Sequence, residues 1–241
     1  MKILIVGESC QDIFMYGQVK RLEPSAPVPV IEINKTVKNP GMAMNVAKNI
    51  ESLNINYDIL TNSNWENQTK TRMVEENINH MFLRVDQEEE YEKFDRNSTD
   101  FSTYDAVIIS DYNKGFLSIE DIQYICSKNN LVFLDTKKPL NSWAECAKYI
   151  KINSAEHRNA EHITEELEEK LILTLGNKGA SHLEKIYPVH KTEVKDLSGA
   201  GDTFLAGLVC RYIESNNIQD SIDFANKCAT KVVQKKGVST V

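Results

Sequence analysis

The sequence has no cysteine pair at C-x-x-C spacing and no long apolar run. No segment approaches the roughly 18 consecutive apolar residues of a membrane span. The apolar start, Ile3–Val6, is also shorter than the core of a signal peptide. These absences predict a soluble protein of the cytoplasm, with reduced and mostly structural cysteines. The five scattered cysteines are Cys10, Cys126, Cys146, Cys210 and Cys228.

Positive charge is also scarce. The chain carries 28 Lys and Arg residues against 35 Asp and Glu residues, with a net charge of -7 and a pI of about 5.4. Nucleic acid and anionic membranes are therefore not expected as partners, and a site for an anionic ligand must gather its cations locally. The 241 residues are 41% hydrophobic, enough for one sizeable core, so we expect a single domain over residues 1–241.

Several chemical signatures are missing as well. The chain has neither the G-x-x-x-x-G-K-[ST] pattern of a P-loop nor a G-x-G-x-x-G after a strand. His157 and His162 lie in a polar segment without the i, i+4 spacing of a zinc-binding helix, so we interpret them as surface residues. The sequence thus argues against a P-loop enzyme, a dinucleotide-binding domain and a zinc enzyme.

Short apolar runs do recur along the chain, each followed by a helical segment. The runs are almost continuously hydrophobic, as strands covered on both faces are. Strands that alternate with helices predict an α/β fold with a mostly parallel sheet. The expected strands are Ile3–Val6, Ala106–Ser110, Leu131–Leu134, Tyr149–Ile152 and Leu171–Leu175, and the expected helices are Gly41–Leu53, Ser118–Lys128, Asp202–Ser215 and Gln219–Lys235.

Two stretches break this rhythm. Val28–Val37 alternates apolar and polar residues after three prolines, and Thr71–Asp86 mixes apolar and charged residues. Both patterns are typical of exposed antiparallel strands. We therefore expect a small β lid, built from about residues 16–39 and 70–92, over one end of the main sheet. Its apolar alternation leaves a face that needs cover, which makes a lid-to-lid homodimer the expected assembly.

The strongest local signal is Leu197-Ser198-Gly199-Ala200-Gly201-Asp202-Thr203, which leads directly into an apolar helix. The two glycines let the backbone approach a ligand closely, and the free amides of a helix N-terminus favour negative charge. Such a loop can hold a transferring phosphoryl group while Asp202 accepts the proton of the attacking hydroxyl. The structural alternative is a glycine-rich turn in which Asp202 or Thr203 caps the helix.

This segment resembles the C-terminal signature of the ribokinase-like (PfkB-type) carbohydrate kinases, and the resemblance extends over the whole chain. The branch it resembles most is the D-glycero-D-manno-heptose-7-phosphate kinase domain of bifunctional heptose kinase/adenylyltransferases. The matching segments are Gly7–Asp12, Pro24–Val30, Pro40–Ala47, Thr69–Arg72, Leu83–Asp86, Ser110–Gly115, Asp135–Lys137, Asn153–Glu156, Thr174–Gly176 with Gly179, and Phe224–Asn226.

The resemblance implies a three-layer sandwich with a small β lid and an ATP-dependent sugar kinase. It makes Asp202 the catalytic base and the amides of Gly199, Ala200 and Gly201 an anion hole. ATP and Mg²⁺ are the implied cofactors, with K⁺ as a further candidate and with Glu156 acting on Mg²⁺ through water. The implied cofactor-binding residues are Asn153, Glu156, Lys137, Thr174, Gly176, Gly179 and Asn226. From the residues alone, Glu156 is equally a loop acid, Lys137 an exposed lysine, and the two glycines turn residues.

The implied substrate-binding residues lie mainly in the first half of the chain. By resemblance, Asp12, Gly41 and Asn45 bind the sugar. Arg72 and Lys114 are our candidates for binding a phosphate already on the sugar, since both residue types recognise phosphate. Asp12 has an alternative role as a loop or cap residue, Asn45 as a helix-surface amide, and the two cations as plain surface charges.

The match departs from the family in two places. Met42 stands where the family usually has a second glycine, and the stretch of about residues 54–68 is too short for the strand–helix–strand usually found there. The expected reaction is transfer of phosphate to the anomeric hydroxyl of a heptose 7-phosphate-like sugar. A kinase for another sugar or a nucleoside, and a non-catalytic sugar- or nucleotide-binding relative, remain alternatives.

Overall fold

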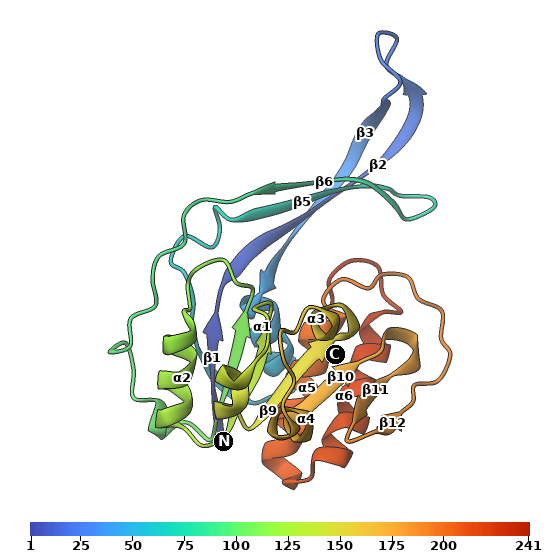
Figure 1. The fold of residues 1–241 in the computed structure, drawn as a ribbon. Helices are drawn as coiled ribbons and strands as arrows, with labels where there is room; N and C mark the ends of the chain where they lie inside the picture. Colours follow the sequence, from blue (N-terminus) through green and yellow to red (C-terminus); the bar gives the residue numbers. More distant parts are fainter.

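The computed structural model describes all 241 residues, which form two β-sheets and the helices that cover the larger one (Figure 1). The larger sheet has eight strands in the order β12-β11-β10-β9-β8-β7-β1-β4. All neighbours from β10 to β4 pair in parallel, while β11 and β12 pair antiparallel at one edge. The expected mostly parallel sheet is confirmed.

The five strands predicted from apolar runs all lie in this sheet, side by side. Their hydrophobic residues are almost fully buried, because helices cover both faces. They are β1 (Lys2–Gly7), β7 (Ala106–Asp111), β8 (Val132–Thr136), β9 (Tyr149–Asn153) and β10 (Leu171–Thr174).

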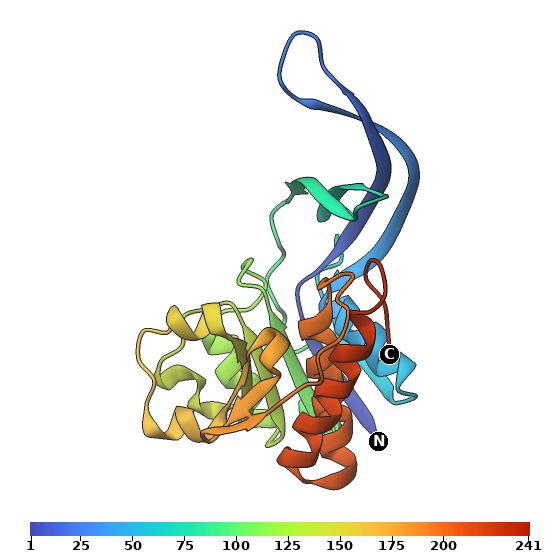
Figure 2. The same ribbon diagram turned by 90° about the vertical axis from the view of Figure 1, so that its right-hand side faces the viewer.

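The helices form a layer on each face of the sheet, which gives three layers in all (Figure 2). Helices α1, α5 and α6 contribute to one hydrophobic cluster, and α2 and α4 contribute to the other. No helix has the length and apolarity that a membrane crossing requires. The helices are α1 (Ala43–Ser52), α2 (Ile119–Lys128), α3 (Ser154–Arg158), α4 (Glu165–Lys170), α5 (Ala200–Ser215) and α6 (Ile218–Val232).

The second sheet is the expected lid and has the order β3-β2-β5-β6. Two long strands, β2 (Ser9–Leu22) and β3 (Pro29–Met42), form an antiparallel hairpin that projects from the body (Figure 1). A shorter hairpin, β5 (Thr69–Glu75) and β6 (His80–Gln87), adds to it through parallel pairing of β5 with β2. The lid is therefore a mixed sheet, where sequence had indicated antiparallel strands alone.

Other elements refine or extend the expectations. The stretch of about residues 54–68, expected to be too short for a strand–helix–strand, contains one strand, β4 (Asn56–Leu60), which pairs with β1 and forms the edge of the main sheet. The last helix ends at Val232 and not at Lys235. Two short strands, β11 (Ala180–His182) and β12 (Lys185–Tyr187), extend the other edge and were not expected. All five cysteines are unpaired, as expected.

Candidate functional site

Polar residues gather where the parallel strands of the main sheet end. Asp111 closes β7, Asp135 lies near the end of β8, and Asn153 closes β9. The carboxyl ends of parallel strands meet at one edge of a sheet, where open α/β folds bind their ligands. The N-terminus of α5 reaches this edge, because Tyr112, directly after β7, contacts Asp202. The lid reaches it through Lys70 of β5, which lies 5.2 Å from the centre of the Tyr112 ring.

The glycine-rich loop ends at Gly199, which has a φ of 79° and begins α5. This left-handed conformation favours glycine, and a Cβ at Gly199 would lie 2.7 Å from the side-chain nitrogen Nδ2 of Asn45. The backbone amides of Gly201 and Asp202 have no acceptor within the chain. Free amides at the head of a 16-residue helix are donors for an anion. Of the three amides predicted for the anion hole, that of Ala200 donates to the carbonyl of Leu197 instead.

Asp202 lies in the first turn of α5 and is buried. Its Oδ2 accepts a hydrogen bond from Nδ2 of Asn45 at 2.8 Å, and its Oδ1 accepts one from the hydroxyl of Tyr112 at 2.9 Å. Burial raises the pKa of Asp202, while the bonds from Asn45 and Tyr112 and the charge of Lys151 lower it in part. A carboxylate with a raised pKa is a suitable general base.

Two buried or partly buried lysines face the same region. Lys151, on β9, donates to Oδ2 of Asp135 at 2.6 Å, and both side chains are about 5% exposed. Lys137 pairs with Glu156 and lies 3.7 Å from Oδ1 of Asp135. Burial alone would lower the pKa of Lys137, but Asp135 and Glu156 outweigh it and the pKa is raised. Asp135, Glu156 and the two lysines thus form one charged network beside the N-terminus of α5.

Asn153 and Glu156 hold each other in a capping box at the start of α3. Oδ1 of Asn153 accepts from the amides of Ala155 and Glu156, and Oε2 of Glu156 accepts from the amide of Asn153. The short helix therefore fixes both side chains at the strand ends. It leaves Oε1 of Glu156 to pair with Lys137.

The donor set fits Mg²⁺ better than a metal held by protein alone. Oδ1 of Asp135 is buried without a hydrogen-bond partner, and Glu156 is close enough to share Lys137 with it. No three His, Cys, Asp or Glu side chains converge as a closed metal cage. Mg²⁺ keeps several waters and binds through one or two carboxylates and the phosphates of its substrate.

Asp12 and Arg72 occupy neighbouring strands of the lid and pair with each other. A Cβ on Gly41 would lie 2.5 Å from Oδ2 of Asp12, so this glycine makes room for the carboxylate. Lys70, two residues before Arg72, lies 3.2 Å from Sδ of Met42 and 5.2 Å from the centre of the Tyr112 ring. No carboxylate pairs with Lys70, so its charge is not neutralised by the chain.

Lys114 and the expected nucleotide residues lie elsewhere around this edge. Lys114 forms an ion pair with Glu88 at 2.6 Å. Thr174 is the last residue of β10, and Gly176 follows the strand. A Cβ on Gly179 would lie 2.0 Å from the carbonyl oxygen of Tyr187. Nδ2 of Asn226 donates to that same carbonyl at 2.8 Å. Gly179 and Asn226 therefore meet at β12, although they are far apart in sequence.

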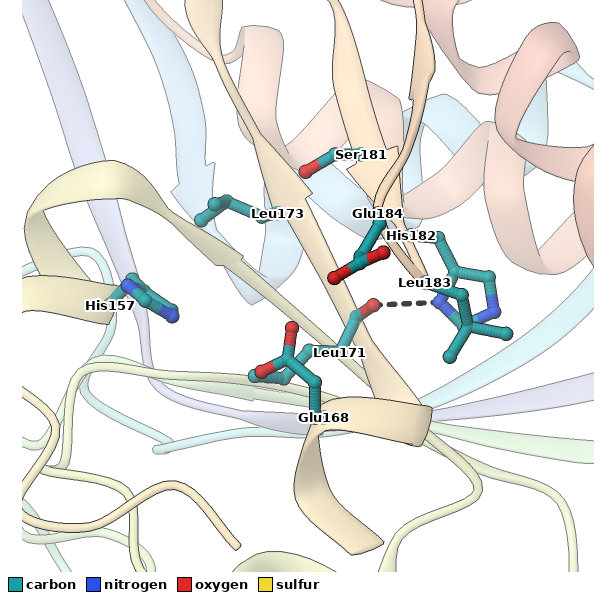
Figure 3. Close-up of a pocket in the computed structure, with 8 residues that line it drawn as sticks. All are labelled: His157, Glu168, Leu171, Leu173, Ser181, His182, Leu183 and Glu184. Atoms are coloured by element: carbon teal, nitrogen blue, oxygen red, sulfur yellow. Dashed lines mark hydrogen bonds between the residues drawn. The ribbon is translucent and has the colours of Figure 1, made fainter. Parts of the chain in front are cut away.

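Two hollows flank these residues. One, of about 320 Å³, lies between the lid and the loop before α5 and is lined by Phe14, Arg72 and Leu197 among others. The other, of about 100 Å³, lies over the face of β10 that is opposite α5, where His182 bonds the carbonyl of Leu171 (Figure 3). Only the first adjoins the loop of Asp202, so we assign the second no part in the site.

The sequence missed three residues of the site. Tyr112, Lys151 and Asp135 were not singled out, although Tyr112 and Asp135 lie in matching segments. Lys151 left one signal, because it is a charged residue inside the apolar run Tyr149–Ile152. For Tyr112 the matching segment did not reveal the contact with Asp202, which joins residues 90 positions apart.

Comparison with known proteins decides the family. Residues 97–241 match the pfkB family of carbohydrate kinases. The chain belongs to this family. The resemblance to carbohydrate kinases noted in the sequence is thus confirmed at the level of the family.

Relatives and solved structures agree with this membership. The chain is 31% identical to the bifunctional protein HldE of Helicobacter pylori over 98% of its own length and 63% of the relative's length. It superposes on ribokinase from Thermotoga maritima with a TM-score of 0.69 at 17% identity, covering 98% and 94% of the two chains. Arabidopsis thaliana ribokinase, solved with ribose and ATP, gives 0.70 at 14% identity, covering 98% and 93%. The expected ribokinase-like fold is confirmed.

Proposed function

We propose that this protein uses ATP and Mg²⁺ to phosphorylate the anomeric hydroxyl of a heptose 7-phosphate-like sugar, giving a 1,7-bisphosphate. Residues 1–241 would act as one kinase unit that includes its lid. The observation that carries the proposal is the buried carboxylate of Asp202, beside backbone amides of α5 that have no acceptor. A base next to an anion hole is the minimal equipment for phosphoryl transfer to a hydroxyl.

In the proposed reaction Asp202 takes the proton of the sugar hydroxyl as its oxygen attacks. The free amides of Gly201 and Asp202 receive the charge of the transferred group. Oδ1 of Asp135 and the carboxylate of Glu156 would hold Mg²⁺, largely through water. When bound, Mg²⁺ supplies charge neutralisation at the phosphates of ATP. Thr174, Gly176, Gly179, Asn226, Asn153 and Lys137 are the residues proposed to bind the nucleotide.

A phosphate already on the sugar is supported by cations of the lid. Lys70 has no acid partner, and Arg72 lines the hollow of about 320 Å³ that adjoins the loop before α5. An unneutralised, partly buried ammonium favours an anionic ligand, because burial costs a charge its hydration. Asp12 and Asn45 are proposed to accept the sugar hydroxyls. Lys114 is the weaker candidate for the phosphate, since Glu88 already neutralises it.

The lid also supports the proposal of a homodimer. Every residue of the edge strand β6 is exposed, including Met81, Phe82, Leu83 and Val85. An exposed apolar edge strand is a surface that a second lid can cover. Sedimentation of wild type and of Leu83→Asp tests this, and a wild-type protein that stays monomeric at high concentration would exclude the dimer.

The decisive experiment pairs sugars with their phosphorylated forms. We expect wild type to consume ATP with heptose 7-phosphate and to act poorly on the unphosphorylated heptose. Asp202→Asn should lose the activity, and Lys70→Met should raise KM for the sugar phosphate at least tenfold. Lys35→Met, an exposed position on β3, is the matched control. Turnover with neutral sugars or nucleosides alone would exclude the phosphorylated substrate, and nucleotide binding without turnover on any acceptor would exclude catalysis.

A further inference from the structure

Lys151 is a buried lysine that uses only part of its hydrogen-bonding capacity. Its exposed fraction is 4%, and its single hydrogen bond goes to Oδ2 of Asp135. An ammonium has three N–H donors, so two of them have no acceptor in the chain. Buried lysines are rare and are normally satisfied, because an unpartnered buried donor is costly.

The ammonium of Lys151 lies directly beside the first turn of α5, because a Cβ on Gly201 would lie 3.2 Å from its Nζ. That turn carries the amides of Gly201 and Asp202, which also lack acceptors. A side chain at residue 201 would crowd the ammonium. Donors of a main-chain loop and of a side chain therefore gather at one place.

The acids nearby do not satisfy these donors. Lys151 forms neither a hydrogen bond nor an ion pair with Asp202, whose carboxylate oxygens accept from Asn45 and Tyr112. Asp135 takes one N–H of Lys151 with Oδ2, and its Oδ1 lies toward Lys137. The remaining N–H groups of Lys151 and the amides of Gly201 and Asp202 therefore need an acceptor from outside the chain, and an anion with several oxygens fits them.

We propose that Lys151 is a catalytic residue, donating to a non-bridging oxygen of the phosphoryl group in transit and completing the ring of donors formed by the amides of Gly201 and Asp202. This inference rests on the proposed kinase function. In the step, the sugar oxygen bonds to the γ-phosphorus as the bond from that phosphorus to the β,γ-bridging oxygen breaks. The hydroxyl proton goes to Asp202, ADP leaves, and Lys151 keeps its protons.

The role predicts a split between kinetic constants. Lys151→Met should lower kcat by about 100- to 1,000-fold, as loss of one donor to developing charge does, with both KM values within about threefold of wild type. Lys151→Arg should restore part of kcat. Lys148→Met, an exposed lysine just before β9, should change nothing. Unchanged kcat in Lys151→Met, or an effect confined to KM for ATP, would overturn the proposal.

Two further measurements keep the proposal testable. Should Lys151→Met fail to fold with Asp135 unpaired, the double variant Lys151→Met/Asp135→Asn is compared with Asp135→Asn alone, and kcat should fall by the same factor. Binding of ADP with aluminium fluoride, a planar phosphoryl mimic, needs no sugar turnover. Lys151→Met should weaken that complex but leave ADP alone unaffected. Equal weakening of both, or none, contradicts the role of Lys151 whether or not a sugar substrate is found.

Discussion

The hydroxyl of Tyr112 donates a hydrogen bond of 2.9 Å to Oδ1 of Asp202, joining the strand end of β7 to the head of α5. The phenol stays protonated, because burial and the charge of Asp202 raise the pKa of Tyr112 well above its ordinary value. The hydroxyl therefore always acts as donor. It stabilises the ionised form of Asp202, the form that can accept a proton.

Removal of this hydroxyl should shift the pH profile of the reaction. The bond from Tyr112 lowers the pKa of Asp202, so Tyr112→Phe should raise it and move the acidic limb of kcat/KM upward by about one pH unit, given the usual strength of a bond to a charged group. Tyr124→Phe, on α2, should leave the limb in place. An acidic limb that does not move, or moves to lower pH, would show that Tyr112 does not act on the base.

Burial of Asp202 should also be visible in stability. Its pKa is raised in the folded state, so the folded protein binds the proton more tightly than the unfolded chain does. Wild type then loses stability as pH rises from about 4 through the folded pKa, by about 1.4 kcal/mol per unit of elevation. The Asp202→Asn variant has no carboxyl group to titrate at this position and does not lose stability in this way. Its free energy of unfolding relative to wild type should rise between pH 4 and 7 in urea titrations, and a constant difference would contradict the prediction.

Met42 precedes α1 with a φ of 61° and a ψ of -131°, a conformation that non-glycine residues adopt at a cost of about 1–3 kcal/mol. Its side chain is buried, so both Met42→Gly and Met42→Ala should lower stability. The glycine variant should nevertheless be the more stable of the two by about 1 kcal/mol, because only glycine relieves the backbone. Denaturant unfolding measures the order. At the exposed helical position Lys48 the order should reverse, and Lys48→Ala should be more stable than Lys48→Gly.

The ion pair of Arg72 with Asp12 should show strong coupling. Both side chains are at most 15% exposed, so removing either partner leaves a poorly hydrated charge. We expect Arg72→Gln and Asp12→Asn each to destabilise the protein, and the double variant to cost less than their sum by at least about 1 kcal/mol. The exposed pair of Lys20 and Glu32 should couple by less than about 1 kcal/mol. Additive effects at Arg72 and Asp12 would mean that each charge is well solvated alone.

The main elements could be predicted because burial leaves a clear pattern in sequence. The central strands are continuous apolar runs, and α2 begins at the capping box of Ser118 and Asp121 that the sequence indicated. The hairpin of β11 and β12 gave no signal, since its turn uses Leu183 and Glu184 at positive φ where Asn-Gly is usual. β4 was missed because it is a half-exposed edge strand with mixed polarity.

Within the site, sequence predicted which residues gather but not how they pair. Asp202, Asn45 and the glycine loop come together as expected. Arg72 and Asp12 were predicted to bind different parts of a substrate, yet they form an ion pair with each other. The role of Lys151 could not be predicted from the sequence, because only the fold shows that this lysine inside a strand points toward the head of α5.

Asp12 lies on β2, a strand of the lid, whereas Asp202 and its partners Asn45 and Tyr112 belong to the body of the protein. Ser9, at the start of the same strand, is anchored to the body through Asn62 and Met44. If the lid lifts about this anchor, Asp12 and Arg72 travel with it. Opening would then remove Asp12 and Arg72 from the sugar-binding pocket as well as expose the pocket to solvent. Product release would therefore coincide with loss of the contacts that bind the substrate.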